Sequence, residues 1–156
     1  MSQRYNPEML LGDLFDLSLR GRVGYVGLDR DGPSGLQELT FGQIADRAAR
    51  VAAVLRRHGL EPGDRVAVYL PNRVEFIDLF LACVQSGLVL VPINVLYRER
   101  EIAHIVEDSQ PKLIVATQAQ RGRFPTGSPV VDVEELAREA DAAPSGSVPR
   151  PIQVTP

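Results

Sequence analysis

The sequence predicts an α/β fold with a mostly parallel sheet and crossover helices. Short apolar runs, of the kind found in strands covered on both faces, alternate along the chain with stretches of helical spacing. This alternation is typical of parallel sheets whose strands are joined by right-handed crossovers. With 156 residues and 44% hydrophobic content, the chain is long enough for one such unit with a buried core.

The start of the chain predicts a helix and a hairpin. Apolar residues recur at helical spacing over residues 9–19, which favours a short amphipathic helix that packs on the body of the fold. The apolar runs 23–28 and 36–39 flank a stretch rich in Gly, Asp, Pro and Ser. We therefore expect one early β-hairpin, the only antiparallel element predicted in this region.

A long amphipathic helix and a buried strand are expected next. Thr40, followed three residues later by Gln43, is a capping-box pattern, in which each side chain satisfies an unpaired backbone N–H at a helix start. Apolar residues then recur at helical spacing until Gly59, which is placed to end the helix in a left-handed conformation. After a Pro-Gly-Asp turn, the apolar run 66–70 predicts a strand.

The alternation of strand and helix continues beyond this strand. Asn72 with Glu75 repeats the capping-box spacing, so a second and almost continuously apolar helix is expected to begin there and to stop at Gly87. Further strands are predicted at residues 88–91, 113–116 and 130–131, and further helices at 99–107 and 134–140.

The composition changes at residue 142. From there the chain is rich in Pro and Ser and shows no apolar periodicity, which is typical of a linker. We therefore divide the sequence into an N-terminal α/β subdomain, residues 1–141, and a linker, residues 142–156. The linker is expected to lead into further polypeptide.

Charge and cysteine content exclude several classes of partner. The net charge of −3 is spread over interspersed residues of both signs, so neither nucleic acid nor an anionic membrane surface is an expected partner. No apolar run is long enough to span a bilayer. Cys83, the one cysteine, sits in an apolar helical run and is interpreted as a small buried residue in a reducing, cytoplasmic setting.

Five motifs stand in order between residues 39 and 116. They are LTF at 39–41, GLEPGDRVA at 59–67, LPN at 70–72, GLVLVPIN at 87–94 and EDSQPKLIV at 107–115. In order and spacing they resemble the N-terminal subdomain of AMP-forming acyl-CoA synthetases and their relatives, the luciferases and the adenylation domains of nonribosomal peptide synthetases. The resemblance implies an incomplete N-terminal subdomain of an adenylate-forming enzyme.

The resemblance also implies a chemistry for the complete enzyme. That enzyme joins a carboxylic acid to ATP, with magnesium, and then transfers the acyl group to coenzyme A. A Ser/Thr/Gly-rich phosphate loop, an acidic residue near magnesium and a lysine of a C-terminal domain would carry the reaction. None of these occurs in this sequence, so we expect no catalytic residue, no metal ligand and no cofactor in this chain, which should be inactive alone.

Four residues are candidates for ligand contact. Asn72 and Asn94 each follow a predicted strand, at the carboxyl edge where open α/β folds place ligands. Both also have a local explanation, Asn72 as a helix cap and Asn94 as a turn residue. Tyr97 and Arg98 could touch a nucleotide or coenzyme A in a complete enzyme, although Arg98 also opens a charged helix start.

Other polar residues have structural explanations. Lys112, the only lysine, opens a predicted strand and is interpreted as a solvated surface charge. His58 and His104 are isolated from cysteines and carboxylate clusters, so neither predicts a metal site.

Several functions remain open at this point. The complete parent is expected to be a fatty-acyl-CoA ligase, with a malonyl- or aryl-CoA synthetase as alternatives, and its partners are the remainder of the synthetase and a carboxylic acid. The alternative class is a stand-alone binding or scaffold module that pairs with a separately encoded remainder. A homo-oligomer of the chain is a separate open alternative. A Rossmann domain is disfavoured because no Gly-x-Gly-x-x-Gly follows any predicted strand.

Overall fold

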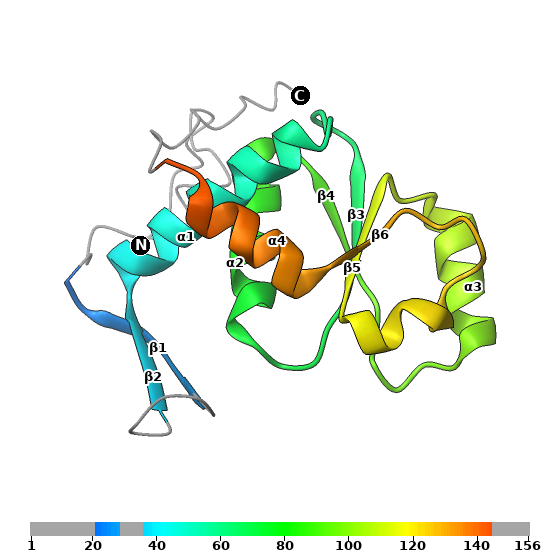
Figure 1. The fold of residues 1–156 in the computed structure, drawn as a ribbon, viewed down its shortest axis with the longest axis horizontal. Helices are drawn as coiled ribbons and strands as arrows, with labels where there is room; N and C mark the ends of the chain where they lie inside the picture. Colours follow the sequence, from blue (N-terminus) through cyan, green and yellow to red (C-terminus); the bar gives the residue numbers. More distant parts are fainter. Residues whose placement is uncertain (1–20, 29–35, 145–156) are drawn as a thin grey trace, which may run out of the picture.

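The computed structural model describes residues 21–28 and 36–144. The helix predicted over residues 9–19 and most of the predicted linker lie outside the described residues. The described chain forms a two-stranded hairpin followed by a parallel α/β unit, in which helices lie on both faces of a sheet (Figure 1).

The hairpin pairs β1 (Val23–Leu28) with β2 (Leu36–Thr40). The two strands are antiparallel, with a register irregularity between Val23 and Tyr25. The hairpin extends away from the α/β unit at the N-terminal end of helix α1 (Figure 1). The predicted hairpin is therefore confirmed.

The central sheet contains four parallel strands. They are β3 (Arg65–Tyr69), β4 (Val89–Pro92), β5 (Leu113–Ala116) and β6 (Val130–Asp132). Their order across the sheet is β4-β3-β5-β6, and each neighbouring pair is parallel. The predicted α/β class and the parallel sheet are confirmed.

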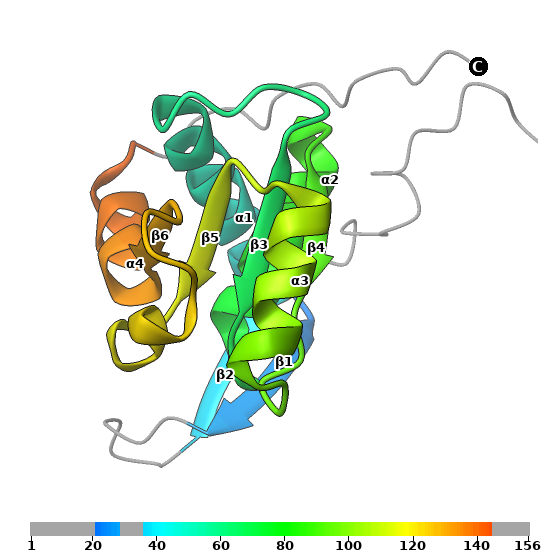
Figure 2. The ribbon, with the colours of Figure 1, turned by 90° about the vertical axis from the view of Figure 1, so that its right-hand side faces the viewer.

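Helices cover the sheet on both faces. On one face lie α1 (Phe41–Arg57), α2 (Val74–Ser86) and α4 (Val133–Ala142). On the other lie α3 (Glu99–Ser109) and the short 3-10 helix η2 (Gln118–Arg123), with α3 in front of the sheet in Figure 2.

Alternate residues of each central strand enter two separate apolar cores. Val66 and Val68 of β3 join the core under α1, α2 and α4, whereas Ala67 and Tyr69 face Ile102 of α3. All four β3 residues are fully buried. Successive strand side chains point to opposite faces, so a strand covered on both sides must be apolar at every position.

Three helix termini predicted from the sequence are confirmed in detail. The Thr40 hydroxyl accepts from the Gln43 N–H at 3.2 Å, and the Thr40 N–H donates to Gln43 Oε1 at 2.8 Å. After α1 and α2 the chain turns through Gly59 and Gly87, whose φ values are 78° and 67°. A residue with a Cβ would be strained at either position.

The predicted start of α2 is wrong by one residue. The helix begins at Val74 and its N-cap is Arg73, without a side-chain capping bond, so Asn72 does not cap it. Glu75 therefore lies at the second helical position, too early to bond back to the cap, and its carboxylate accepts from Arg73 Nε instead. The capping-box spacing at Asn72 was a coincidence.

Smaller differences occur at other boundaries. β4 begins one residue later than predicted, and α3 continues two residues further, to a left-handed Gln110 with φ of 43°. η2 was not predicted, because six residues without apolar periodicity give no helical signal.

Cys83 is a buried core residue, as predicted. It is 1% exposed and belongs to the core shared by α1, α2 and α4. Burial raises the pKa of its thiol to about 12, so the nucleophilic thiolate is absent at neutral pH.

The Cys83 thiol is expected to be unreactive in the folded chain. At pH 8, a thiol reagent such as 5,5′-dithiobis(2-nitrobenzoate) should label less than one tenth of the molecules in the time that labels all of them in denaturant. The measurement is the absorbance of the released thiolate with and without guanidinium. Rapid stoichiometric labelling of the folded chain would show that the core opens readily.

Candidate functional site

The carboxyl edge of the parallel sheet is the candidate site. From β3 the chain crosses through α2 to β4 on one side, and then returns through α3 to β5 on the other side. The strand order therefore reverses between β3 and β5. Ligands of open α/β sheets bind outside the carboxyl ends of the strands at such a switch point.

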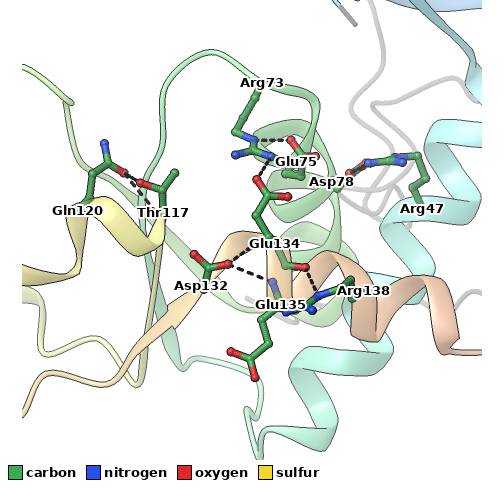
Figure 3. A network of polar contacts seen from close by, with 10 residues as sticks. All are labelled: Arg47, Arg73, Glu75, Asp78, Thr117, Gln120, Asp132, Glu134, Glu135 and Arg138. Carbon is green, nitrogen blue, oxygen red and sulfur yellow. Dashed lines mark hydrogen bonds and ion pairs between the residues drawn. The ribbon is translucent and has the colours of Figure 1, made fainter. Parts of the chain in front are cut away.

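Asn72 and Arg73 follow β3 and lie at this edge. Asn72 is exposed, and no hydrogen bond of its side chain is found in the described part of the chain. Arg73 is half-buried and reaches two carboxylates on two helices, with Nε 2.6 Å from Glu75 Oε2 and Nη2 2.7 Å from Glu134 Oε1 (Figure 3). Arg73 thus ties the start of α2 to the start of α4.

In the network of Arg73, Glu75 and Glu134, the positive charge of Arg73 lies beside both carboxylates. The hydrogen bond from Arg73 to Glu75 raises the pKa of Arg73 above its already high value. Burial alone would raise the pKa of Glu75, but the hydrogen bonds from Arg73 and the backbone hold it below its usual range. Arg73 and Glu75 are therefore both charged at neutral pH, so neither is placed for proton transfer.

Asp132 at the end of β6 caps α4. Its Oδ1 accepts from the backbone N–H groups of Glu134 at 2.9 Å and Glu135 at 3.2 Å (Figure 3). The sequence carried this signal, since an Asp followed three residues later by a Glu is a helix-start signature, but we missed it.

The loop that follows β4 contains three of the predicted candidates, Asn94, Tyr97 and Arg98. Asn94 Oδ1 accepts from the Leu96 N–H at 2.9 Å, and the Asn94 carbonyl accepts from the Tyr97 N–H at 3.0 Å. Asn94 is thus a turn residue. Arg98 is the N-cap of α3, and its N–H donates to Glu101 Oε2 at 2.7 Å. The Tyr97 side chain is 38% exposed.

Tyr69 fixes this loop from inside the sheet. Its ring is fully buried, and its hydroxyl donates to the Val95 carbonyl at 3.0 Å. Arg123 Nη1 donates to the same hydroxyl oxygen at 3.0 Å, and Phe124 meets the Tyr69 ring edge to face at 5.7 Å. Tyr69, which sequence reasoning did not single out, therefore connects β3 to the two segments that follow β4 and β5.

Thr117 is the polar residue that follows β5. Its hydroxyl donates to Gln120 Oε1 at 2.8 Å, and its N–H donates to the same oxygen at 3.2 Å (Figure 3). This contact closes the first turn of η2.

A cleft of about 290 Å³ adjoins the Arg73 network. α1, α2 and α4 line it with an apolar floor and a charged rim. Across it, Arg47 of α1 binds Asp78 of α2 in a bidentate pair, with Nη2 2.6 Å from Oδ2 and Nε 3.1 Å from both carboxylate oxygens. Asp78 is 2% exposed, and burial raises the pKa of its carboxyl although Arg47 opposes the rise.

These residues do not form a phosphate or metal site. An anion would bind at a helix N-terminus, but Asp132 already occupies the N–H groups of α4 and Glu75 lies in the first turn of α2. Within residues 21–28 and 36–144, no cluster of His, Cys, Asp and Glu could hold a metal ion. The described edge therefore does not fit a magnesium–triphosphate, and no reaction step is derived through one.

Lys112 and the two histidines lie outside this edge, and Lys112 and His58 each lie beside a carboxylate. Lys112 Nζ lies 2.7 Å from Asp64 Oδ2, and this hydrogen bond lowers the pKa of Asp64. His58 Nε2 lies 3.1 Å from Glu139 Oε2, between the end of α1 and α4. His104 is exposed on α3. In the part of the chain that the structure describes, no helix is long and apolar enough to cross a membrane.

Strand order and layer arrangement define the molecule as a doubly wound parallel α/β unit. Comparison with known proteins then identifies the family. The family described as AMP-binding enzyme matches residues 22–154. The chain belongs to this family, and the resemblance carried by the five sequence motifs is confirmed.

Relatives of the chain include two acid–AMP ligases. The long-chain-fatty-acid–AMP ligase FadD26 of Mycobacterium marinum is 36% identical in an alignment 150 residues long that covers 86% of this chain and 24% of FadD26. The p-hydroxybenzoic acid–AMP ligase FadD22 of Mycobacterium tuberculosis is 35% identical over 111 residues, 71% of this chain and 16% of FadD22. The chain thus spans less than a quarter of these relatives.

A solved structure of the same family shares the fold. The ATP-bound MatB of Rhodopseudomonas palustris superposes with a TM-score of 0.67 at 26% identity, over 83% of this chain and 27% of MatB. The predicted class, an N-terminal subdomain of an adenylate-forming enzyme, is therefore confirmed at the level of fold.

Replacement of Arg47 by alanine is expected to destabilise the fold by about 3 kcal/mol at pH 7, because it leaves the buried Asp78 carboxylate unpaired. Burial then raises the folded-state pKa of Asp78 further above its unfolded value near 4. The folded state binds that proton more tightly, so the stability of R47A should fall as pH rises from about 4 towards neutrality. Urea unfolding at several pH values measures both effects.

The pH dependence is the diagnostic part of this prediction. The double variant R47A/D78A removes both partners and should lose the extra pH dependence of R47A. A constant difference between R47A and the wild type across the pH range would contradict the assignment.

Replacement of Tyr69 by phenylalanine should loosen the loop after β4. The change keeps the ring and removes only the hydroxyl, so the Val95 carbonyl loses its donor at a cost of about 1–2 kcal/mol. Hydrogen–deuterium exchange should become faster in residues 94–98. Tyr97→Phe is the matched control, because no hydrogen bond of its hydroxyl is found among the described residues; unchanged exchange in Y69F would exclude the role given to Tyr69.

Proposed function

We propose that the chain is the N-terminal portion of an ATP-dependent, AMP-forming carboxylic acid ligase, and that it is catalytically silent alone. The proposal rests on two findings together: the family match covers most of the chain, and the chain covers only 24% of FadD26 and 16% of FadD22. The lack of fit between the described edge and a triphosphate supports it.

The complete enzyme would use ATP, magnesium and coenzyme A, with residues beyond this chain holding them. A fatty acid is the substrate class we favour, because FadD26, which aligns with 86% of the chain, is a long-chain-fatty-acid–AMP ligase. A cytoplasmic setting agrees with the single buried thiol of Cys83.

An aryl acid is the second candidate substrate. FadD22, a p-hydroxybenzoic acid–AMP ligase, is 35% identical to the chain over a shorter alignment. The choice between these two substrate classes rests on the relatives.

The purified chain should not exchange labelled pyrophosphate into ATP in the presence of magnesium and either a fatty or an aryl acid. The physical reason is that Asp132 already occupies two N–H groups of α4 and that the first turn of α2 carries the negative charge of Glu75. A complete acid–AMP ligase in the same assay is the positive control. Acid-dependent exchange by the chain above background would overturn the proposed silence.

A second experiment tests the parent activity. An antibody against residues 65–94 captures the native protein from its source cells, and the intact mass and acid-dependent exchange of the captured protein are measured. We expect a mass several times that of this chain and exchange that favours fatty acids. Exchange with aryl acids alone would select the second candidate, whereas a product of this size without exchange would indicate a stand-alone module.

A further inference from the structure

Strand β4 is the last strand on one side of the parallel sheet, among the residues that the structure describes (Figure 2). It is less buried than the inner strands, because Val89 is 48% exposed and Leu90 and Val91 are only half-buried. Successive side chains alternate between the two faces, so Leu90 packs on the core under α1, α2 and α4 while Val91 packs on the core under α3. The apolar side chains of this edge are therefore incompletely covered on both faces of the sheet.

The backbone of β4 also presents hydrogen-bonding groups at this edge. The N–H groups of Val89 and Ile93 donate towards β3, each 2.9 Å from its carbonyl acceptor. Because alternate residues of a strand bond to opposite sides, the N–H and C=O groups of Leu90 and the C=O group of Pro92 point away from β3. No hydrogen bond of these outward groups is found within the described residues. Pro92 has no N–H, so acceptors outnumber donors along the edge.

No charged residue lies within β4 to protect this edge. Edge strands of soluble proteins usually carry lysine, inward-pointing charges, bulges or proline, which prevent pairing with other strands. β4 has the sequence VLVP, in which Pro92 at the end is the one such device. The edge strand on the other side of the sheet, β6, is three residues long, ends in Asp132 and buries Val130. Of the two edges, β4 is therefore better suited to accept another strand.

We propose that an extended segment of the polypeptide that a complete ligase carries beyond this chain completes the sheet at the β4 edge. The inference rests on the proposed function, in which this chain is the part that covers only 24% of a relative such as FadD26. The segment adds a strand through main-chain hydrogen bonds to Leu90 and Pro92. Its apolar side chains, at alternate positions, cover Val89 and Val91 on one face of the sheet and Leu90 on the other.

A second copy of the chain fits this edge less well. Two β4 edges, paired with each other in any register, bring more carbonyl acceptors than N–H donors, because Pro92 supplies only an acceptor in each copy. A strand of different sequence, with an N–H at each alternate position, matches the carbonyls of Leu90 and Pro92. Hydrogen-bond complementarity therefore favours a different segment over self-pairing.

Single-residue hydrogen–deuterium exchange tests the proposal on this chain alone and on the native protein, tagged at its N-terminus and purified from its source cells. In the chain alone, the Leu90 amide should exchange faster, relative to its intrinsic rate, than the Val89 amide, which bonds towards β3. In the native protein, the Leu90 amide should exchange at least about ten times more slowly than in the chain alone, because it then donates to the added strand. The intact mass of the native protein is measured on the same sample.

A charge at the edge locates the contact. Val89→Lys in the native protein should return the Leu90 amide to the rate of the chain alone, because it places a charge beside the apolar strand. In the chain alone the same variant should leave the urea midpoint of unfolding unchanged, since Val89 is 48% exposed there. Val23→Lys is the matched control: it makes the same change at a position 52% exposed on the hairpin and should leave the protection of Leu90 intact.

The outcomes separate this inference from the proposed function. A native protein larger than this chain, with a Leu90 amide that exchanges as fast as in the chain alone, would overturn the inference and leave the proposed function standing. Protection that survives Val89→Lys would also overturn it. Slow exchange of Leu90 in the chain alone would do the same, and protection that grows with protein concentration would make a second copy the occupant. A native protein of this size would remove the proposed function and the inference with it.

Discussion

Burial of β3 and β5 on both faces is the constraint on which the rest of the structure depends. Val66 and Val68 of β3 face one core while Ala67 and Tyr69 face the other, and all four are inaccessible to solvent. At about 1.5–3 kcal/mol for a large apolar side chain, such strands hold the sheet together only when helices cover both sides. The crossovers through α2 and α3 on opposite faces meet this need, and they also create the switch point between β3 and β5.

The carboxyl edge is rigid because its polar groups satisfy one another. Tyr69 holds the loop after β4 through the Val95 carbonyl, and Arg73 joins the first turns of α2 and α4 through Glu75 and Glu134. Closed polar networks of this kind position neighbouring backbone but leave few groups for chemistry. The edge is a supporting structure on which residues from elsewhere in an adenylate-forming enzyme would have to act.

Much of this fold was predictable because its signals are local. Apolar periodicity located the helices and strands, and the cap at Thr40 and the stop at Gly87 agree with the structure. The candidate site was less predictable, because Arg73, Tyr69 and Asp78 gain their roles from partners distant in sequence. The Arg47–Asp78 pair, for example, joins residues 31 positions apart, and no pattern along the chain reveals that contact. At Asn72 a local pattern was present, but the helix starts one residue later.

Charge placement explains why family membership does not by itself give this chain a nucleotide site. Phosphate binding at the carboxyl edge of the sheet needs helix N-termini with free N–H groups, and α4 has given two of these to Asp132. A phosphate at the same place would have to displace a carboxylate and approach Glu134 and Glu75 as well. Since like charges repel most strongly where water is excluded, the acidic start of α4 favours its present ion pair with Arg73 over any phosphate ligand.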